Sequence, residues 1–183
     1  MTENAPPPFA HPVVLLLAGS TSDLDLVLEC QETLDGLGVP SSIRVVSAHR
    51  TPEVAAECAS GAEEQGFLVL IAFAGLAAQL AGMAAAHSRL PVIGVPRAVG
   101  PLQGVDAVLA SLQMPPGTPV GVVAIDGARN AALLAARILG TAHPEIRERL
   151  TELAQHDRSR YAPEKIEAEI EQRTLTRRRR KSE

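Results

Sequence analysis

The sequence predicts an α/β protein in which a parallel sheet is covered by helices on both faces. Short apolar runs of strand length alternate with amphipathic segments of helical period along residues 13–139, which is the pattern of βαβ units. The first run, residues 13–18, is continuously apolar, as expected of a strand buried on both faces. A chain of 183 residues that is 46% hydrophobic is long enough for one such domain with appendages.

Five strands are expected in this domain, each followed by a helix. The strands are placed at residues 13–18, 43–46, 67–73, 91–95 and 119–125. The helices are placed at residues 23–37, 52–65, 77–87, 104–112 and 128–139. Gly38 and Gly66 end the first two helices, and Pro52 is suited to open the second. The many alanines of the later helices favour a close approach to the sheet or to another helix.

The termini differ from the domain in composition. Residues 1–12 are rich in proline and are predicted to be a flexible leader, before an α/β domain at residues 13–140. Residues 141–174 are charged and helical in pattern, with a break near Pro163. This extension has too little apolar content to form its own domain, so we expect it to pack on neighbouring subunits or to extend into solvent. The basic tail, residues 175–183, is predicted to be disordered.

The composition excludes several classes of function. The net charge is −4 and aromatic residues make up only 2% of the chain, which argues against a nucleic-acid binder. Cys30 and Cys58 form neither a disulfide framework nor a metal spacing. No signal pattern and no membrane-spanning run is present in the sequence, so the chain is expected to be soluble and cytoplasmic.

The stretch Ser47-Ala48-His49-Arg50-Thr51-Pro52 directly follows the second expected strand. His49 supplies an imidazole that can carry a proton, and Arg50 a guanidinium that can hold a phosphate. In open parallel sheets, ligands sit at the carboxyl ends of strands, where loops reach them. An isolated His or Arg is more often structural, but this position, with Ser47 and Thr51 alongside, favours a reactive site.

Two more strand ends carry candidate binding loops. The first strand is followed by Gly19-Ser20-Thr21-Ser22-Asp23, whose hydroxyls and backbone N–H groups at a helix start suit an anion. Ordinary helix capping is the alternative interpretation of this segment. After the third strand, residues 74–83 are mostly small, which either lets a ligand approach the backbone or serves packing.

No metal-ligand spacing, nucleophile elbow or dinucleotide fingerprint is present in the sequence. The residues therefore predict a sheet that holds a phosphorylated small molecule, with one imidazole available for proton transfer. The predicted reaction needs no cofactor, and in particular no metal or redox group.

Six ordered segments between residues 14 and 140 resemble the class I N5-carboxyaminoimidazole ribonucleotide mutase family of purine biosynthesis. These segments are Gly19-Ser20-x-Ser22-Asp23, Ser47-Ala48-His49-Arg50-Thr51-Pro52, Pro91-Val92-Ile93-Gly94-Val95-Pro96, Gly104-Val105-Asp106, Gln113-Met114-Pro115-x-Gly117-x-Pro119-Val120 and Asn130-Ala131-Ala132-Leu133-Leu134-Ala135. The resemblance implies a three-layer α/β/α sandwich with a parallel flavodoxin-like sheet. It also implies a homo-octamer whose C-terminal helices reach neighbouring subunits.

The resemblance further implies a reaction, in which the carbamate carboxylate on N5 of the substrate moves to C4 of the imidazole ring. His49 would be the general acid/base. The other implied site residues would bind or line the ribonucleotide. They are Ser20, Ser22, Asp23, Ser47, Ala48, Arg50, Gly75, Leu76 and Gln79. Among them, Ser20 and Asp23 would bind phosphate and ribose, and Arg50 would bind the phosphate.

The loop after the third strand departs from the family pattern Gly-Ala-Gly-Gly-Ala-Ala-His-Leu-Pro-Gly-Met. Phe73 and Leu76 stand in place of glycines, Gln79 in place of the histidine and Ala81 in place of the proline. A positive φ at Leu76 would cost about 1–3 kcal/mol of strain. Two alternatives to the mutase therefore stay open: a paralogous enzyme that carboxylates or decarboxylates another ribonucleotide, and a non-catalytic homologue that binds a nucleotide or serves in an assembly.

Overall fold

The computed structural model describes residues 9–179 of the chain, and side chains as far as residue 174. The predicted leader therefore lies largely outside the described residues, as do the last four residues of the predicted basic tail. The chain divides into two compact units, of which the first ends at Arg147 and the second begins at Glu148. The first unit contains the sheet and the candidate site.

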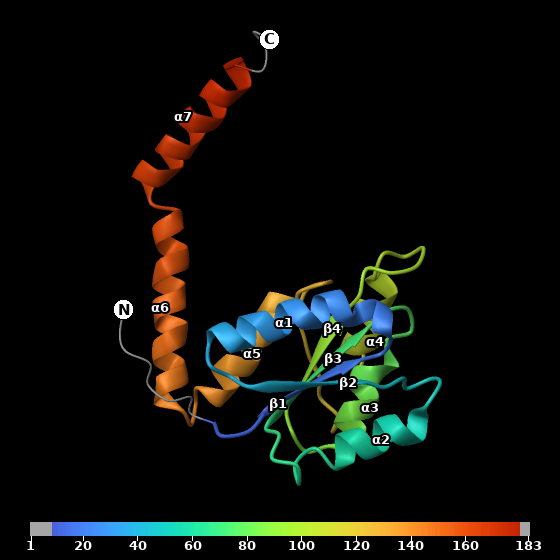
Figure 1. Cartoon of the computed structure of the whole chain (residues 1–183). Helices are drawn as coiled ribbons and strands as arrows, with labels where there is room; N and C mark the ends of the chain where they lie inside the picture. Colours follow the sequence, from blue (N-terminus) through green and yellow to red (C-terminus); the bar gives the residue numbers. More distant parts are fainter. Residues whose placement is uncertain (1–8, 180–183) are drawn as a thin grey trace. The chain divides into compact units, whose positions relative to one another are not determined.

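The sheet has five strands, all parallel, in the order β2-β1-β3-β4-β5. The strands are β1 (Val14–Ala18), β2 (Ser41–Val45), β3 (Val69–Ala74), β4 (Val92–Pro96) and β5 (Gly121–Val122). In register, Ala18 lies opposite Val45 of β2 and Phe73 of β3. The carboxyl ends of β1, β2 and β3 therefore meet at one edge of the sheet (Figure 1).

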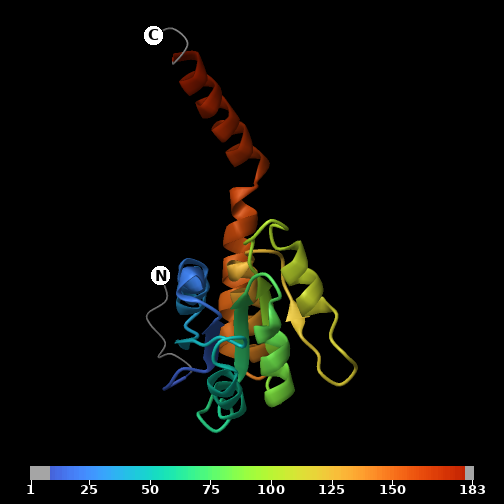
Figure 2. The same cartoon turned by 90° about the vertical axis from the view of Figure 1, so that its right-hand side faces the viewer.

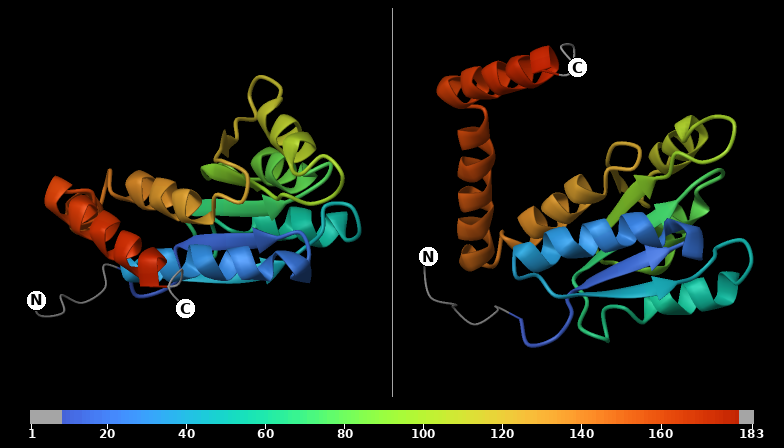
Figure 3. Two further views of the ribbon diagram at one scale, coloured as in Figure 1. Left: turned by 90° about the horizontal axis from the view of Figure 1, so that it is seen from above. Right: turned by 45° about the horizontal axis from the view of Figure 1, so that its top comes forward.

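Helices cover both faces, which confirms the predicted three-layer architecture (Figures 1 and 3). The helices of the first unit are η1 (Thr21–Asp23, a 3-10 turn), α1 (Leu24–Gly36), α2 (Pro52–Ser60), α3 (Gln79–His87), α4 (Val105–Leu112) and α5 (Ala128–Leu139). Helices α1 and α5 pack together on one face, and α3 contacts both α2 and α4 on the other. Pro52 is the first residue of α2, as predicted.

The core is aliphatic and alanine-rich. All residues of β1 and β4, and all but the last of β3, are buried, as expected of inner strands of a parallel sheet. Helix α5 turns five buried alanines toward the interior, Ala128, Ala131, Ala132, Ala135 and Ala136. Their small side chains allow the close approach of α5 to α1 that the composition predicts.

Two predicted elements are much shorter in the structure than the sequence indicates, whereas the others differ by at most two residues at each end. Helix α2 ends at Ser60 because Gly61 caps it, and residues 61–66 form turns up to Gly66, which has a φ of 87°. Strand β5 comprises two residues and pairs only with β4. Pro119 has no N–H to donate to a ladder, so the regular pairing begins only after it.

The charged extension forms two helices, α6 (Pro144–Arg160) and α7 (Pro163–Arg179), and the predicted break near Pro163 is where α6 gives way to α7 (Figure 2). The start of α6 belongs to the first unit, where Ile146 is fully buried. Helix α7 continues into the predicted basic tail as far as Arg179. Among residues 9–179, no helix is long and apolar enough to cross a membrane.

Candidate functional site

The site lies where the direction of chain winding reverses. From β1 the chain passes to β2 on one side and then returns to β3 on the other side of β1. Such a switch point opens a crevice at the carboxyl ends of the strands. A cavity of about 510 Å³ occupies this position. Its lining comes from the segments after β1, β2, β3 and β4, namely Gly19, Ser20, Ser22, Asp23, Ser47, Ala48, His49, Arg50, Ala74, Gly75, Leu76, Ala78, Gln79, Leu80 and Val99.

The turn after β2 is closed by its own hydrogen bonds and presents His49. The Ser47 N–H donates to Thr51 Oγ1 at 3.2 Å, and the Thr51 hydroxyl donates back to the Ser47 carbonyl at 3.2 Å. The Arg50 N–H donates to Ser47 Oγ at 3.2 Å. These bonds fix the backbone on both sides of His49, whose side chain is exposed at the cavity.

Arg50 links this turn to the end of β1. Its Nη2 donates to the Gly19 carbonyl at 3.2 Å, and its Nε donates to Ser47 Oγ at 3.4 Å. A guanidinium has five N–H donors in a planar fork, so these two bonds orient the group and leave donors for an anion in the cavity. The arrangement suits a phosphate held beside the imidazole of His49.

The segment after β1 combines capping with a buried charge. Ser20 Oγ accepts a hydrogen bond from the Ser22 N–H at 3.3 Å, so the capping interpretation holds for Ser20. Asp23 precedes α1 but makes no side-chain cap. The residue is only 5% exposed, and its carboxylate instead accepts a hydrogen bond from Nε of Arg97 at 3.2 Å. Burial raises the pKa of the Asp23 carboxyl, and Arg97 and a backbone hydrogen bond from Ser20 oppose that rise.

Arg97, which contacts the cavity residue Asp23 without lining the cavity, is a charged residue that the sequence analysis did not predict. It directly follows β4 and is only 9% exposed, which is rare for an arginine. The available signal was a charged residue placed at the end of a fully apolar strand. Nothing in the sequence pointed to its partner, because Asp23 lies 74 positions away.

The loop after β3 shows which of the residues that depart from the family pattern reach the cavity. Leu76 has a φ of 56° and Ala78 a φ of 42°, so the strain expected at Leu76 is present. Leu76 and Gln79 line the cavity, whereas Phe73 and Ala81 are buried in the interior away from it. Phe73 therefore does not obstruct the site, and the departure that reaches a ligand is confined to Leu76 and Gln79.

The structure brings all the predicted site residues to this one cavity, from the three segments that follow β1, β2 and β3. Their roles stay predictions, since the geometry alone assigns no ligand. Within the described part of the chain, no three His, Cys, Asp or Glu side chains come together as a possible metal site. The side chains that can act chemically here are the imidazole of His49, the guanidinium of Arg50 and the carboxylate of Asp23.

A five-stranded parallel sheet with a cavity at its switch point defines an α/β protein of flavodoxin-like fold that is suited to a small ligand. Residues 13–160 match the AIR carboxylase family, and the chain belongs to that family.

Individual relatives agree with this assignment. The N5-carboxyaminoimidazole ribonucleotide mutase of Pyrococcus horikoshii is 53% identical over 139 residues, which are 76% of this chain and 78% of that protein. The mutase of the same name from Saccharolobus solfataricus is 45% identical over 157 residues, 86% of this chain and 99% of that protein. The crystal structure of PurE from Treponema denticola superimposes with a TM-score of 0.74 at 28% identity, covering 82% of this chain and 94% of that one.

Proposed function

We propose that this protein is an N5-carboxyaminoimidazole ribonucleotide mutase, which moves a carboxylate from N5 to C4 of its substrate in purine biosynthesis. The observation that carries the proposal is that His49 and Arg50 share one cavity with Ser20 and Asp23, each on the segment where the family motifs occur. The cavity volume of about 510 Å³ falls in the range of small-ligand sites. A cytoplasmic location is part of the same proposal.

The proposed reaction has two steps that share one proton. His49 in its protonated form gives a proton to N5 while the bond from N5 to the carboxylate carbon breaks, which releases carbon dioxide and the neutral amine. The ring then attacks carbon dioxide through C4, forming the new carbon–carbon bond. The proton on C4 returns to His49, so the imidazole ends in its starting state. The carbon dioxide must stay in the site between the steps, which requires that water be excluded.

The residues around His49 support this assignment of roles. Arg50, whose guanidinium is oriented by Gly19 and Ser47, would bind the phosphate. Ser20 and Ser22 supply hydroxyl groups beside it, and Asp23 supplies a carboxylate that can accept hydrogen bonds from ribose hydroxyls. Binding the sugar-phosphate at one end fixes the ring at the other, which provides the positioning that both proton transfers need.

A second candidate is favoured by the loop after β3. Leu76 and Gln79 line the cavity in place of the glycine and histidine of the family pattern, so the space around the ring is reshaped. A paralogous enzyme that carboxylates or decarboxylates a related ribonucleotide fits this change. Gln79 can donate and accept hydrogen bonds but does not titrate, which leaves His49 as the acid/base in both candidates.

Purified protein incubated with N5-carboxyaminoimidazole ribonucleotide distinguishes the mutase from its alternatives. The mutase yields the C4 carboxylate isomer, and a decarboxylase of this substrate yields aminoimidazole ribonucleotide and carbon dioxide. A paralogue specific for another ribonucleotide and a binding homologue both yield neither. We expect the protein to interconvert the two isomers, whether it is given the N5 or the C4 carboxylate. The absence of this interconversion refutes the mutase proposal.

The matching variant is His49→Asn, which removes the titratable group and keeps a similar polar size. We expect kcat to fall by about 10²–10⁴-fold, the usual contribution of a general acid/base, while substrate affinity measured by calorimetry is retained. His87→Asn is the control, because His87 is an exposed residue at the end of α3 outside the cavity lining. Full activity in His49→Asn would contradict the assigned role.

The proposal includes a homo-oligomer, for which an octamer is the expected size. Four apolar side chains before and along α4 are more than half exposed, Leu102, Val105, Leu109 and Leu112. A cavity of about 420 Å³ is also lined by α3, α4 and the residues flanking them, namely Ala77, Ala78, Gln79, Gly82, Met83, Ala110 and Met114. Exposed apolar side chains gathered on and just before one helix support a protein interface at this face. Analytical ultracentrifugation tests this part, and a monomer at micromolar concentration would contradict it.

A further inference from the structure

One ionic cluster beneath the cavity is not explained by the roles given above. It is centred on Arg97, which follows β4, and it gathers three aspartates from different parts of the chain. Nε lies 3.2 Å from Asp23 Oδ1, Nη2 lies 3.3 Å from Asp25 Oδ1, and Nη1 lies 3.4 Å from Asp126 Oδ1. The guanidinium thereby joins η1, the start of α1 and the turn after β5.

The cluster is built around its most buried pair. The side chains of Arg97 and Asp23 are 11% and 8% exposed, whereas those of Asp25 and Asp126 are 74% and 40% exposed. Nη2 of Arg97 also donates to the Ser22 carbonyl at 3.4 Å, which ties it to the backbone of η1. The backbone N–H of Arg97 donates to the Ala74 carbonyl at 3.0 Å, continuing the ladder beyond β4. Arg97 is therefore held both at its backbone and at its guanidinium.

Of the three aspartates, only Asp23 lines the cavity. We propose that Arg97 is a positioning residue for the substrate: its guanidinium holds the Asp23 carboxylate toward the hydroxyl groups of the bound ribonucleotide, and Asp126 holds the guanidinium in turn. The inference rests on the proposed function, and it adds to the site a residue that does not itself line the cavity.

The charge balance around Asp23 supports this role. Burial of Asp23 disfavours its ionised form, and Asp25 on α1 adds to that effect, so both raise the pKa of Asp23. Arg97 is the charged group that opposes them. On the cavity side, Arg50 reaches the same segment through the Gly19 carbonyl. Without Arg97, the carboxylate would lose its buried partner and keep its acidic neighbour.

Asp126 is the outer support of the cluster. It has a φ of 53°, a conformation that Asp and Asn tolerate better than most residues. Its Oδ1 accepts a hydrogen bond from the Ala98 N–H at 3.1 Å as well as from Arg97. The turn after β5 is thereby attached to the loop after β4, and the carboxylate is held against Nη1.

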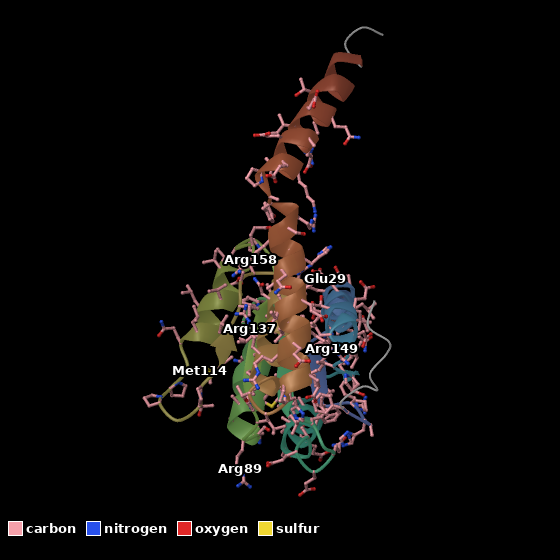
Figure 4. All side chains as sticks on the ribbon, turned by 90° about the vertical axis from the view of Figure 1, so that its left-hand side faces the viewer. Glu29, Arg89, Met114, Arg137, Arg149 and Arg158 are labelled. Carbon is pink, nitrogen blue, oxygen red and sulfur yellow. The ribbon has the colours of Figure 1, made fainter. Side chains whose placement is uncertain are left out.

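The test compares Arg97→Met with the wild-type enzyme in the mutase assay. We expect KM to rise about 10- to 100-fold, the loss typical of a charged hydrogen bond, with a much smaller change in kcat. The acid limb of the pH profile of kcat/KM should also move to higher pH, because Asp23 then titrates without Arg97. Arg89→Met is the matched control, since Arg89 lies at the opposite end of β4, is exposed and extends away from the sheet (Figure 4).

A purely structural role predicts a different result, in which Arg97→Met lowers kcat/KM equally at all pH values and leaves KM unchanged. That result would overturn the inference. Should Arg97→Met fail to fold, as judged by circular dichroism, Asp126→Asn decides. It keeps Arg97 in place and retains an acceptor for the Ala98 N–H, and KM should rise about threefold, as for a partly exposed ion pair. An unchanged KM in that variant would equally overturn it.

Failure of the proposed function is separate from failure of this inference. A wild-type protein that does not interconvert the two carboxylated ribonucleotides refutes the mutase. An active wild type whose Arg97→Met variant keeps its KM and its pH profile refutes only the role of Arg97.

Discussion

The two walls of the cavity are held together by different kinds of contact. The first wall comprises the segments after β1 and β2, Gly19–Asp23 and Ser47–Arg50, which are tied together by hydrogen bonds from Arg50. The second wall comprises Ala74–Gln79 after β3, together with Val99. Here the contacts are steric: a Cβ on Gly75 would lie 2.0 Å from Val99 Cγ2, and one on Gly100 would lie 2.6 Å from Leu76 Cδ2.

The walls also differ in backbone conformation, because Leu76 and Ala78 of the second wall have positive φ and no residue of the first wall is a non-glycine with positive φ. Among the described residues, the non-glycine residues with positive φ are Leu76, Ala78, Gln103 and Asp126, and all of them follow β3, β4 or β5. Each costs strain that the surroundings must offset. The first wall thus keeps the polar groups that the family motifs contain, while the second wall is where this chain differs in shape. Under the proposed function, the first wall would anchor the sugar-phosphate and the second would contact the ring.

The largest effect outside the acid/base residue is expected in the first wall, at Arg50. Arg50→Ala should weaken substrate binding by about 1.5–3 kcal/mol, the contribution of a hydrogen bond to a charged group. Calorimetric titration measures this directly. Arg44→Ala serves as the control, because Arg44 is exposed on the neighbouring strand β2 and lies outside the cavity lining. Equal affinity in the Arg50 variant would remove it from the phosphate site.

In the second wall, Gly75→Ala should destabilise the fold. The added methyl group would overlap Val99 and lie 3.2 Å from the Cβ of Arg97, so the two loops must separate. We expect a loss of about 1–3 kcal/mol in the free energy of unfolding, as for other overpacked sites. Denaturant unfolding measures it. Gly36→Ala is the control, since no neighbour lies within 4 Å of its added Cβ and alanine is favoured in helices.

The smallest effect is expected for Leu76→Gly, which removes a side chain but relieves the left-handed backbone. Leu76 is 53% exposed, so little burial is lost. The variant should gain about 0.5–1 kcal/mol of stability, because glycine adopts positive φ without strain. In Leu68→Gly, a half-exposed leucine without a positive φ, the same substitution should lower stability. A loss of stability at both positions would show that Leu76 is held by packing rather than strained.

Much of this arrangement could be predicted from the sequence. The alternation of apolar runs with amphipathic segments predicted the parallel sheet, because the periods of strand and helix are set by local geometry. Pro52 predicted the start of α2, and the polar residues after the first two strands predicted the side of the sheet where the cavity lies. These features depend on residues close together in the chain.

The tertiary structure decided the rest. Phe73 and Leu76 both replace glycines of the family pattern within four residues, yet Phe73 is buried in β3 and Leu76 lines the cavity. Which of the two meets the ligand depends on where the strand ends and on the backbone turn that follows. Similarly, the pairing of Arg97 with Asp23 spans 74 positions and arises only because strand order brings the ends of β1 and β4 to one edge. Local sequence sets the elements and their polar ends, but contacts across the sheet depend on the order in which strands pair, and that order is a property of the whole fold.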